Sequence, residues 1–177
     1  MKKLSFLLII LVLLASLCGC KGKETLQFYV VEGELLSGGE SDGELLSIAK
    51  KRGRLVFTDA DMEGYLWKDH TVRLKEAPVR GSMTDGGSRL FQAEPQDRFL
   101  LVLGNRVLYR GGFDEGSGST TPQISPYIMD ESNQSFSILF SSKYSEGEDP
   151  RGNERLYRFL TDRQLLSSKL NQNQSED

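Results

Sequence analysis

Cysteine and histidine, the side chains that most often bind metals or act as nucleophiles and bases, are nearly absent from this 177-residue sequence. The two cysteines are Cys18 and Cys20, and no thiol follows them for a disulfide, a redox pair or a thiolate metal site. His70 is the single histidine, which excludes zinc sites with several histidines and iron sites with two. We therefore expect a domain without metal or cofactor, stabilised by its hydrophobic core alone.

The motifs of several common enzyme classes are absent as well. The sequence contains no phosphate-binding loop that ends in Lys-Ser or Lys-Thr and no dinucleotide-binding fingerprint. The nearest approach to a Gly-x-Ser-x-Gly nucleophile elbow is residues 116–119, where Glu115 stands two residues before Ser117 in place of glycine. Basic residues are not in excess, with 22 Lys and Arg against 25 Asp and Glu, which argues against a nucleic-acid partner.

The first 20 residues have the composition of a secretory signal peptide. A charged start, Met1-Lys2-Lys3, precedes an apolar run from Phe6 to Ala15, and small or apolar residues then lead to Cys20. This pattern resembles the signal peptide and lipobox of bacterial lipoproteins. The resemblance implies cleavage before a cysteine that carries a diacylglycerol, so that two acyl chains such as palmitate hold the mature protein on a membrane.

Cys20 fits the lipobox better than Cys18. Leu17 lies three residues before Cys20 and Gly19 directly before it, whereas cleavage before Cys18 would place the bulky Leu17 where that family has Gly, Ala or Ser. The alternative is an uncleaved membrane helix, for which residues 4–20 fall short of the roughly 20 apolar residues that a span needs. We expect a location on the outer side of the cytoplasmic membrane, or in the periplasm on the outer membrane of a host that has one.

Removal of residues 1–19 leaves 158 residues, the size of one ordinary domain. Two lysines are lost with them, so 20 basic side chains remain against 25 acidic ones and the net charge is −5. Residues 20–25 are too short to be a long tether. We expect one globular domain at residues 26–166 and a disordered tail at 167–177, where Gln, Asn, Ser and acids predominate.

The pattern of apolar residues predicts an α+β fold, with a mainly antiparallel sheet of about five to seven strands and two or three short helices. Strands are expected at residues 26–32, 54–58, 70–75, 99–103, 106–110, 124–129 and 136–140. The run 99–103 is apolar throughout, which is typical of a central strand covered on both faces. Gly104-Asn105 predicts a tight hairpin after it, and Pro126 restricts residues 124–129 to an edge or bulged strand.

Helices are predicted where cap signals occur. Residues 47–52 end in three basic side chains before Gly53, which suits a helix C-terminus. Asp149-Pro150 opens a last helix, whose apolar stripe for docking on the sheet consists of Leu156, Phe159 and Leu160.

His70 and a group of acids are the candidates for chemistry. His70 has the only side chain with an ordinary pKa near neutrality, so a general base would be sought there first. We favour a structural or solvent-exposed role, because no positioned partner or substrate pocket can be named from the sequence. Asp59, Asp61 and Glu63 could hold a calcium ion, but they lack the glycine turn and closing glutamate of an EF-hand. We favour helix capping by Thr58 or Asp59.

Aromatic residues are the candidates for a contact surface. Five of them are expected to be exposed at strand ends or beside glycine-rich loops, where they could contact a peptide or a sugar: Tyr65, Trp67, Tyr109, Phe113 and Tyr127. We favour the interpretation that they cap the core and keep the contact surface as the alternative. The candidate binding residues are accordingly Asp61, Tyr65, Trp67, His70, Tyr109 and Phe113.

Two further resemblances concern the part that follows the signal peptide. Residues 57–62, a strand at 70–75, a short helix near Leu90-Phe91 and a hairpin at 100–109 resemble the periplasmic head region of the protein-translocase subunit SecD, over about a third of the chain. That resemblance implies a non-enzymatic binding and conformational module and carries over no catalytic residue. The string Asp-x-x-x-Tyr-x-Trp-x-x-His-x-Val-x-Leu, which ends at Leu74, resembles small uncharacterised bacterial lipoproteins.

The expected function is that of a membrane-anchored extracytoplasmic lipoprotein, a non-enzymatic binding or accessory module of the cell envelope with an envelope protein or peptide as partner. The alternative is a small envelope hydrolase that uses His70 with a carboxylate. A deep pocket that gathers His70 with two polar partners would favour the hydrolase. A shallow aromatic groove or an open sheet edge would favour binding.

Overall fold

The computed structural model describes residues 24–77, 91–94, 96–113, 125–130, 134–143 and 148–167. The strands are β1 Leu26–Val31, β2 Arg54–Thr58, β3 Met62–Leu66, β4 Thr71–Leu74, β5 Arg98–Leu103, β6 Arg106–Phe113, β7 Tyr127–Asp130, β8 Ser135–Leu139 and β9 Leu166–Ser167. The helices are α2 Asp42–Arg52, α3 Glu154–Asp162 and the 3₁₀-helices η1 Gly33–Leu35, η2 Asp59–Asp61 and η3 Pro150–Gly152. The signal peptide and residues 168–177 of the expected tail lie outside the described residues.

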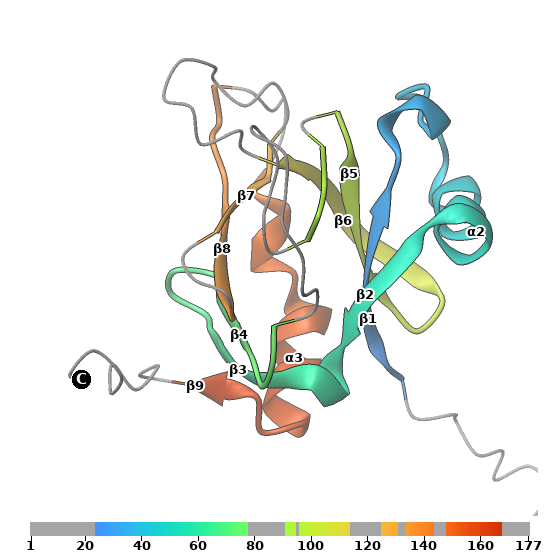
Figure 1. Cartoon of the computed structure of the whole chain (residues 1–177). Coiled ribbons are helices and arrows are strands. Elements are labelled where there is room, and N and C mark those ends of the chain that lie inside the picture. The colour runs from blue at the N-terminus through green and yellow to red at the C-terminus, as the bar shows by residue number, and fades with distance from the viewer. Residues whose placement is uncertain are drawn as a thin grey trace, which may run out of the picture.

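The strands form one curled sheet in the order β2-β1-β5-β6-β7-β8-β4-β3-β9 (Figure 1). Most neighbours are antiparallel, while β6 with β7 and β3 with β9 are parallel. The α+β class is confirmed in its broad form, but the sheet is larger than expected and partly parallel. The two strands that the pattern did not predict are β3, which contains Glu63 and Gly64, and β9, which has two residues.

Aromatic rings fill the inner side of the curled sheet. Phe28 of β1 is stacked on Phe57, Phe91 and Phe99, with ring centroids 4.8, 5.1 and 5.3 Å apart. Phe136 meets Phe28 edge-on at 5.9 Å. None of the five side chains is more than 3 % exposed. Phe28 is therefore the centre of the core.

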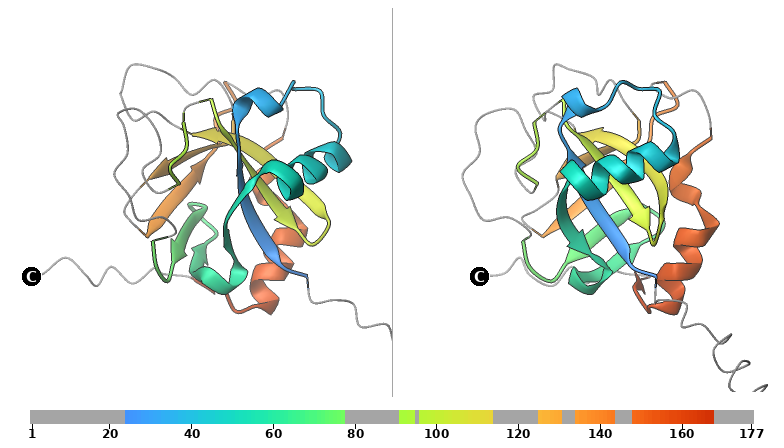
Figure 2. Two further views of the ribbon diagram at one scale, coloured as in Figure 1. Left: turned by 45° about the vertical axis from the view of Figure 1, so that its right-hand side comes forward. Right: turned by 90° about the vertical axis from the view of Figure 1, so that its right-hand side faces the viewer.

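Helix α2 covers the outer side of the sheet, as the right-hand view of Figure 2 shows. Leu45 and Ala49 are buried in a second apolar cluster with Tyr29, Val31, Leu100, Val102 and Val107. Strand β5 is therefore covered on both faces, as its apolar run predicted. The helix begins with a Ser41–Glu44 capping box and ends at Gly53 after a basic last turn, which confirms the predicted C-terminus.

The pentapeptide Gly-Glu-Leu-Leu-Ser occurs twice, at residues 33–37 and 43–47, and the two copies differ in structure. The first copy begins the 3₁₀-helix η1, which no side chain caps, whereas the second lies in α2, which Ser41 caps. Both copies nevertheless contribute leucines to the outer cluster: Leu45 is buried in it, and Leu35, Leu36 and Leu46 pack against it.

Strands β5 and β6 form the expected tight hairpin. Leu103 pairs with Arg106 across a two-residue turn in which Gly104 has a φ of +61°. A positive φ at Gly104 without one at Asn105 is characteristic of a type II′ turn.

The prediction for β7 is wrong. This strand pairs with both β6 and β8, so it is not an edge strand. Pro126 is tolerated because it directly precedes Tyr127, the first residue of the strand. No strand hydrogen bond therefore requires an N–H group at this position.

Helix α3 packs on the core through the predicted stripe of Leu156, Phe159 and Leu160. The helix starts later than expected. Asp149 caps the 3₁₀-helix η3, and Asn153 then caps α3 by accepting hydrogen bonds from two N–H groups of its first turn. The short η3 places Asp149 and Arg151 beside the end of β8, where Arg151 donates to the carbonyl oxygen of Ile138 at 2.8 Å.

Candidate functional site

His70 ends the turn between β3 and β4 with a left-handed φ of +51°. A hydrogen bond of 2.9 Å joins its Nδ1 to the hydroxyl of Tyr65, a side chain that is 1 % exposed. Burial raises the pKa of Tyr65 above its usual value, so the phenol keeps its proton. Within the described residues Nδ1 is the only acceptor within reach of this proton, and we infer that the phenol donates to it. Neutral His70 therefore carries its own proton on Nε2.

A second buried phenol stands behind this pair. Tyr109 of β6 is 6 % exposed, and its hydroxyl finds no hydrogen-bond partner in the part of the chain that the structure describes. It lies close enough to Tyr65 for each group to affect the pKa of the other, although the geometry falls short of a hydrogen bond. An unpaired buried hydroxyl costs about 1–3 kcal/mol, so this point of the core has an unsatisfied polar group.

Asp149 and Arg151 form an ion pair close to His70. Arg151 donates to both carboxylate oxygens of Asp149, with 2.6 Å between Nη2 and Oδ2, and its guanidinium lies 5.6 Å from the centroid of the Phe140 ring. The side-chain hydrogen bond from Arg151 is the main reason that the pKa of Asp149 lies below its usual value. The carboxylate is therefore held by Arg151 and acts on His70 through its charge.

The part of the site that solvent reaches is aromatic. Trp67 is partly buried and meets His70 and Tyr157 of α3 edge-on, with ring centroids 5.4 and 4.9 Å apart. Tyr157 is 43 % exposed. Trp67 and the half-buried His70 come from the β3–β4 turn, and Tyr157 comes from α3. Together the three rings form a small aromatic surface. We call Trp67, His70 and Tyr157 the aromatic patch.

The hydrogen bond to Nδ1 limits the chemistry that His70 can perform. A general base needs an unprotonated nitrogen directed at the substrate, and the unprotonated nitrogen here is Nδ1, which accepts from Tyr65. Nε2 carries the proton and can only donate. In this arrangement the imidazole is suited to hydrogen-bond a ligand, and it becomes a base only if its contact with Tyr65 breaks.

Two of the predicted candidates lie away from His70. Asp61 accepts hydrogen bonds from the N–H and the hydroxyl of Thr58, at 2.8 and 2.9 Å, and so completes a capping box at η2. The capping interpretation of Thr58 is therefore confirmed. Asp61 also borders a cavity of about 430 Å³ between β2 and the end of β4, whose lining does not include His70. Phe113 packs in the core against Phe91.

The expected exposure of the aromatic residues is wrong for Tyr65, Tyr109 and Phe113, which are 1 %, 6 % and 4 % exposed. Each of them lies on the inner side of the sheet, and the curl of the sheet closes around them. Only Trp67 among the candidate aromatics reaches solvent at the aromatic patch. For the three buried rings the structure supports the favoured interpretation, a place in the core.

Sequence reasoning missed Asp149, Arg151 and Tyr157 as neighbours of His70. The only local signal among them is Asp149-Pro150, which indicates a helix start and says nothing of the distant turn. They reach His70 because η3 and α3 follow β8, which lies next to β4 in the sheet.

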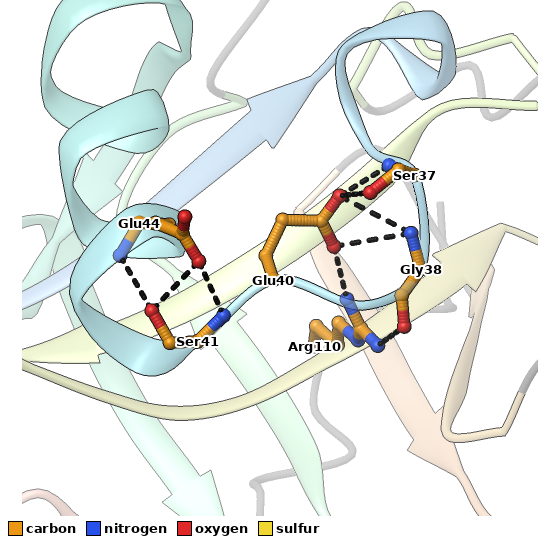
Figure 3. Close-up of polar contacts among 6 residues, drawn as sticks. All are labelled: Ser37, Gly38, Glu40, Ser41, Glu44 and Arg110. Carbon is orange, nitrogen blue, oxygen red and sulfur yellow. Dashed lines mark hydrogen bonds and ion pairs between the residues drawn. The ribbon is translucent and has the colours of Figure 1, made fainter.

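Glu40 forms a second polar cluster, shown in Figure 3. Its side chain is 8 % exposed and accepts hydrogen bonds from the N–H groups of Ser37 and Gly38, from the Ser37 hydroxyl at 2.8 Å and from Arg110 at 3.0 Å. Hydrogen bonds from its own backbone N–H and from the Ser37 hydroxyl lower the pKa of Glu40 to about 2. Both carboxylate oxygens are engaged, so the cluster fastens the loop before α2 to β6.

Comparisons with known proteins add no identity: no family model, no curated protein and no solved structure matches this chain. Within the described ranges, no helix has the length and apolar character needed to cross a membrane. The same ranges contain no group of three or more His, Cys, Asp or Glu side chains placed to hold a metal ion.

His70 is expected to make folding pH-dependent. Burial lowers its pKa below 6.5 and nearby Arg151 lowers it further, against smaller opposing effects of Asp149 and Asp69. Since the unfolded chain binds the proton more tightly, the contribution of neutral His70 to stability is complete above pH 6.5 and is lost as the pH falls from there towards the folded pKa. The free energy of unfolding in urea should therefore fall between about pH 7.5 and pH 5.5.

His70→Asn is the matched variant, because Asn accepts a positive φ and has no charge to gain. The pKa of Asp149, the acid that His70 affects, lies below its usual value and outside this pH range, so the difference between the two pH profiles reports His70. Profiles that run parallel over this range would contradict the prediction.

Proposed function

We propose that this chain is a bacterial lipoprotein whose acylated Cys20 anchors it on the outer side of the cytoplasmic membrane, or on the outer membrane of a host that has one. The observation that carries the proposal is the lipobox-like sequence Leu17-Cys18-Gly19-Cys20, which begins two residues after the apolar run from Phe6 to Ala15. Strand β1 begins six residues after Cys20, so the anchor precedes a folded domain with almost no linker.

Cys20→Ala is expected to abolish acylation, and the neighbouring cysteine supplies the control. Cells that produce either variant are fed a radiolabelled fatty acid, and the label on the purified protein is measured. Cys18→Ala should be labelled like the parent, because Cys18 is removed with the signal peptide, whereas Cys20→Ala should carry no label. Full labelling of Cys20→Ala would reject Cys20 as the attachment site.

The anchored domain acts, in this proposal, as a non-enzymatic binding or accessory module of the cell envelope. The support is the aromatic patch, in which an exposed Tyr157 ring and a partly exposed Trp67 ring adjoin the Nε2–H donor of a neutral His70. Aromatic faces beside a neutral donor suit a peptide or a sugar. The partner would be an envelope protein or peptide.

The alternative is a small envelope hydrolase that uses His70 with a carboxylate, and one observation favours it. Asp149 is close enough to His70 to raise the pKa of the imidazole, so an acid and a potential base do lie together. Incubation of the lipoprotein with envelope peptides and glycans distinguishes the hydrolase from the binding module. New cleavage products that disappear with His70→Asn support the hydrolase, and crosslinks to Tyr157 without cleavage support the binding module.

A further inference from the structure

The chain leaves the folded domain at a point that is held from two sides. Glu24 forms an ion pair with Arg155, and its carbonyl oxygen accepts a hydrogen bond of 2.6 Å from Arg163. From the other side, the N–H of Gly104 donates to the carbonyl oxygen of Thr25 at 3.0 Å. The right-hand view of Figure 2 shows the start of β1 and the β5–β6 turn beside α3 at this exit. The chain is thus fixed to the domain from Glu24 onward.

The fixed exit limits how the domain can lie on a membrane. Three residues separate Cys20 from Glu24, and even a fully extended chain covers at most about 3.6 Å per residue. Glu24 is therefore held within about 15 Å of the acylated cysteine. The opposite end of the domain cannot turn towards the bilayer, because the chain would then have to cross the domain to reach its exit.

Basic side chains gather at the exit although the mature chain has a net charge of −5. Lys50, in the last turn of α2, donates to the side chain of Asn105 in the β5–β6 turn at 2.8 Å, and the exposed Arg106 begins β6 directly after this turn. The segment that leads to Cys20 adds Lys21 and Lys23. These four cations point to an anionic surface as the partner of this end of the domain.

The other two cations at the exit are balanced by acids. Arg155 pairs with Glu24, and Arg163 lies 3.4 Å from Asp59, whose side chain is 9 % exposed. These pairs fix the exit and contribute no net charge. The excess positive charge therefore comes from Arg106 at the start of β6, from Lys50 and from the connecting segment.

We propose that this end of the domain, the anchor face (Glu24, Lys50, Asn105, Arg106, Arg155 and Arg163), lies against the bilayer and contacts anionic lipid headgroups. The proposal rests on lipid attachment at Cys20 and adds an orientation and a class of lipid to it. Cations within a Debye length of about 10 Å are attracted by an anionic surface. Because the anchor keeps the face close to that surface, even a weak contact is populated most of the time.

The test uses the whole lipoprotein, purified in its acylated form and reconstituted in vesicles. The mature chain has no free thiol, so Asn105→Cys and Gly39→Cys each introduce a unique site for a fluorescent label. Gly39 is the matched control, because a Cβ there would meet no atom within 4 Å. It belongs to the segment between η1 and α2, which Figure 1 shows at the end of the domain away from the exit. A lipid with a spin label on its headgroup quenches the dye that is near the membrane.

In vesicles that contain phosphatidylglycerol, we expect quenching at Asn105 to exceed quenching at Gly39 at least about twofold. It should fall in pure phosphatidylcholine, at about 0.5 M salt, and in the variant Lys50→Glu with Arg106→Glu. Both substituted side chains are exposed, and an unchanged unfolding temperature shows that this variant is folded.

Equal quenching at Asn105 and Gly39 would overturn the proposal. Quenching at Asn105 that changes neither with phosphatidylglycerol nor with salt would also overturn it. Flotation with the vesicles at high salt separates this failure from failure of the anchor. A protein that floats but shows equal quenching keeps its lipid and loses only the oriented face. A protein that does not float lacks the anchor, which overturns both.

Discussion

Gly111→Ala is expected to destabilise the domain by about 3 kcal/mol or more. A Cβ at this position would lie 2.1 Å from the carbonyl oxygen of Pro126 and 2.4 Å from the ring of Phe99. Neither neighbour can move aside, because Pro126 accepts a hydrogen bond of 3.0 Å from Gly112 and Phe99 is fully buried. The substitution would therefore force β6 away from both the core and β7. The measurement is the free energy of unfolding in urea.

Gly43→Ala is the matched control. A Cβ on Gly43 would meet no atom within 4 Å, and the residue lies in the first turn of α2. Alanine there should stabilise the protein slightly, by about 0.5 kcal/mol, since it reduces the freedom of the unfolded chain. If the two variants differed from the parent by similar amounts, the close approach at Gly111 would not be the cause.

Phe28→Ala should cost about 3–5 kcal/mol. The substitution removes the ring at the centre of the aromatic core, and the four rings around it come from β2, β5, β8 and the segment at Phe91. Because the four rings belong to different elements, each fixed by its own backbone pairing, they cannot all move inward to fill the cavity that the missing ring leaves. Against a typical total stability of about 5–15 kcal/mol, such a loss leaves a marginal domain. Thermal unfolding should show a markedly lower midpoint.

Leu55→Ala on the neighbouring strand β2 provides the comparison. Leu55 is 47 % exposed and belongs to neither apolar cluster, so its truncation should change stability by less than about 1 kcal/mol. A loss for Phe28→Ala no larger than that for Leu55→Ala would show that the aromatic core relaxes freely.

Local patterns were sufficient for the elements that have a local cause. The hairpin from β5 to β6 follows from two apolar runs on either side of Gly104-Asn105, and the α2 terminus from basic residues before Gly53. Strand β3 has no such pattern, since Glu63 and Gly64 interrupt it, and it exists because β4 and β9 pair with it. The place of β7 between two strands likewise depends on the tertiary fold.

The candidate site divides in the same way. Tyr65, Trp67 and His70 lie within six residues of one another, and their proximity followed from the sequence alone. Arg151 and Tyr157 arrive on η3 and α3, and no local rule relates those elements to the turn at His70. Nor could the burial of Tyr65 be predicted, because it results from the curl of a sheet whose strands come from the whole chain.

The repeated pentapeptide allows the same five residues to be compared in two structural settings within one molecule. The amide of Leu35 donates to the carbonyl oxygen of Glu32 at 3.0 Å, and the amide of Leu45 donates to that of Ser41 at 2.9 Å. Both amides sit in identical side-chain sequences, in one solvent and in one molecule. Any difference between their hydrogen-exchange rates therefore measures what a cap and a tertiary environment add to five fixed residues, with intrinsic propensity cancelled.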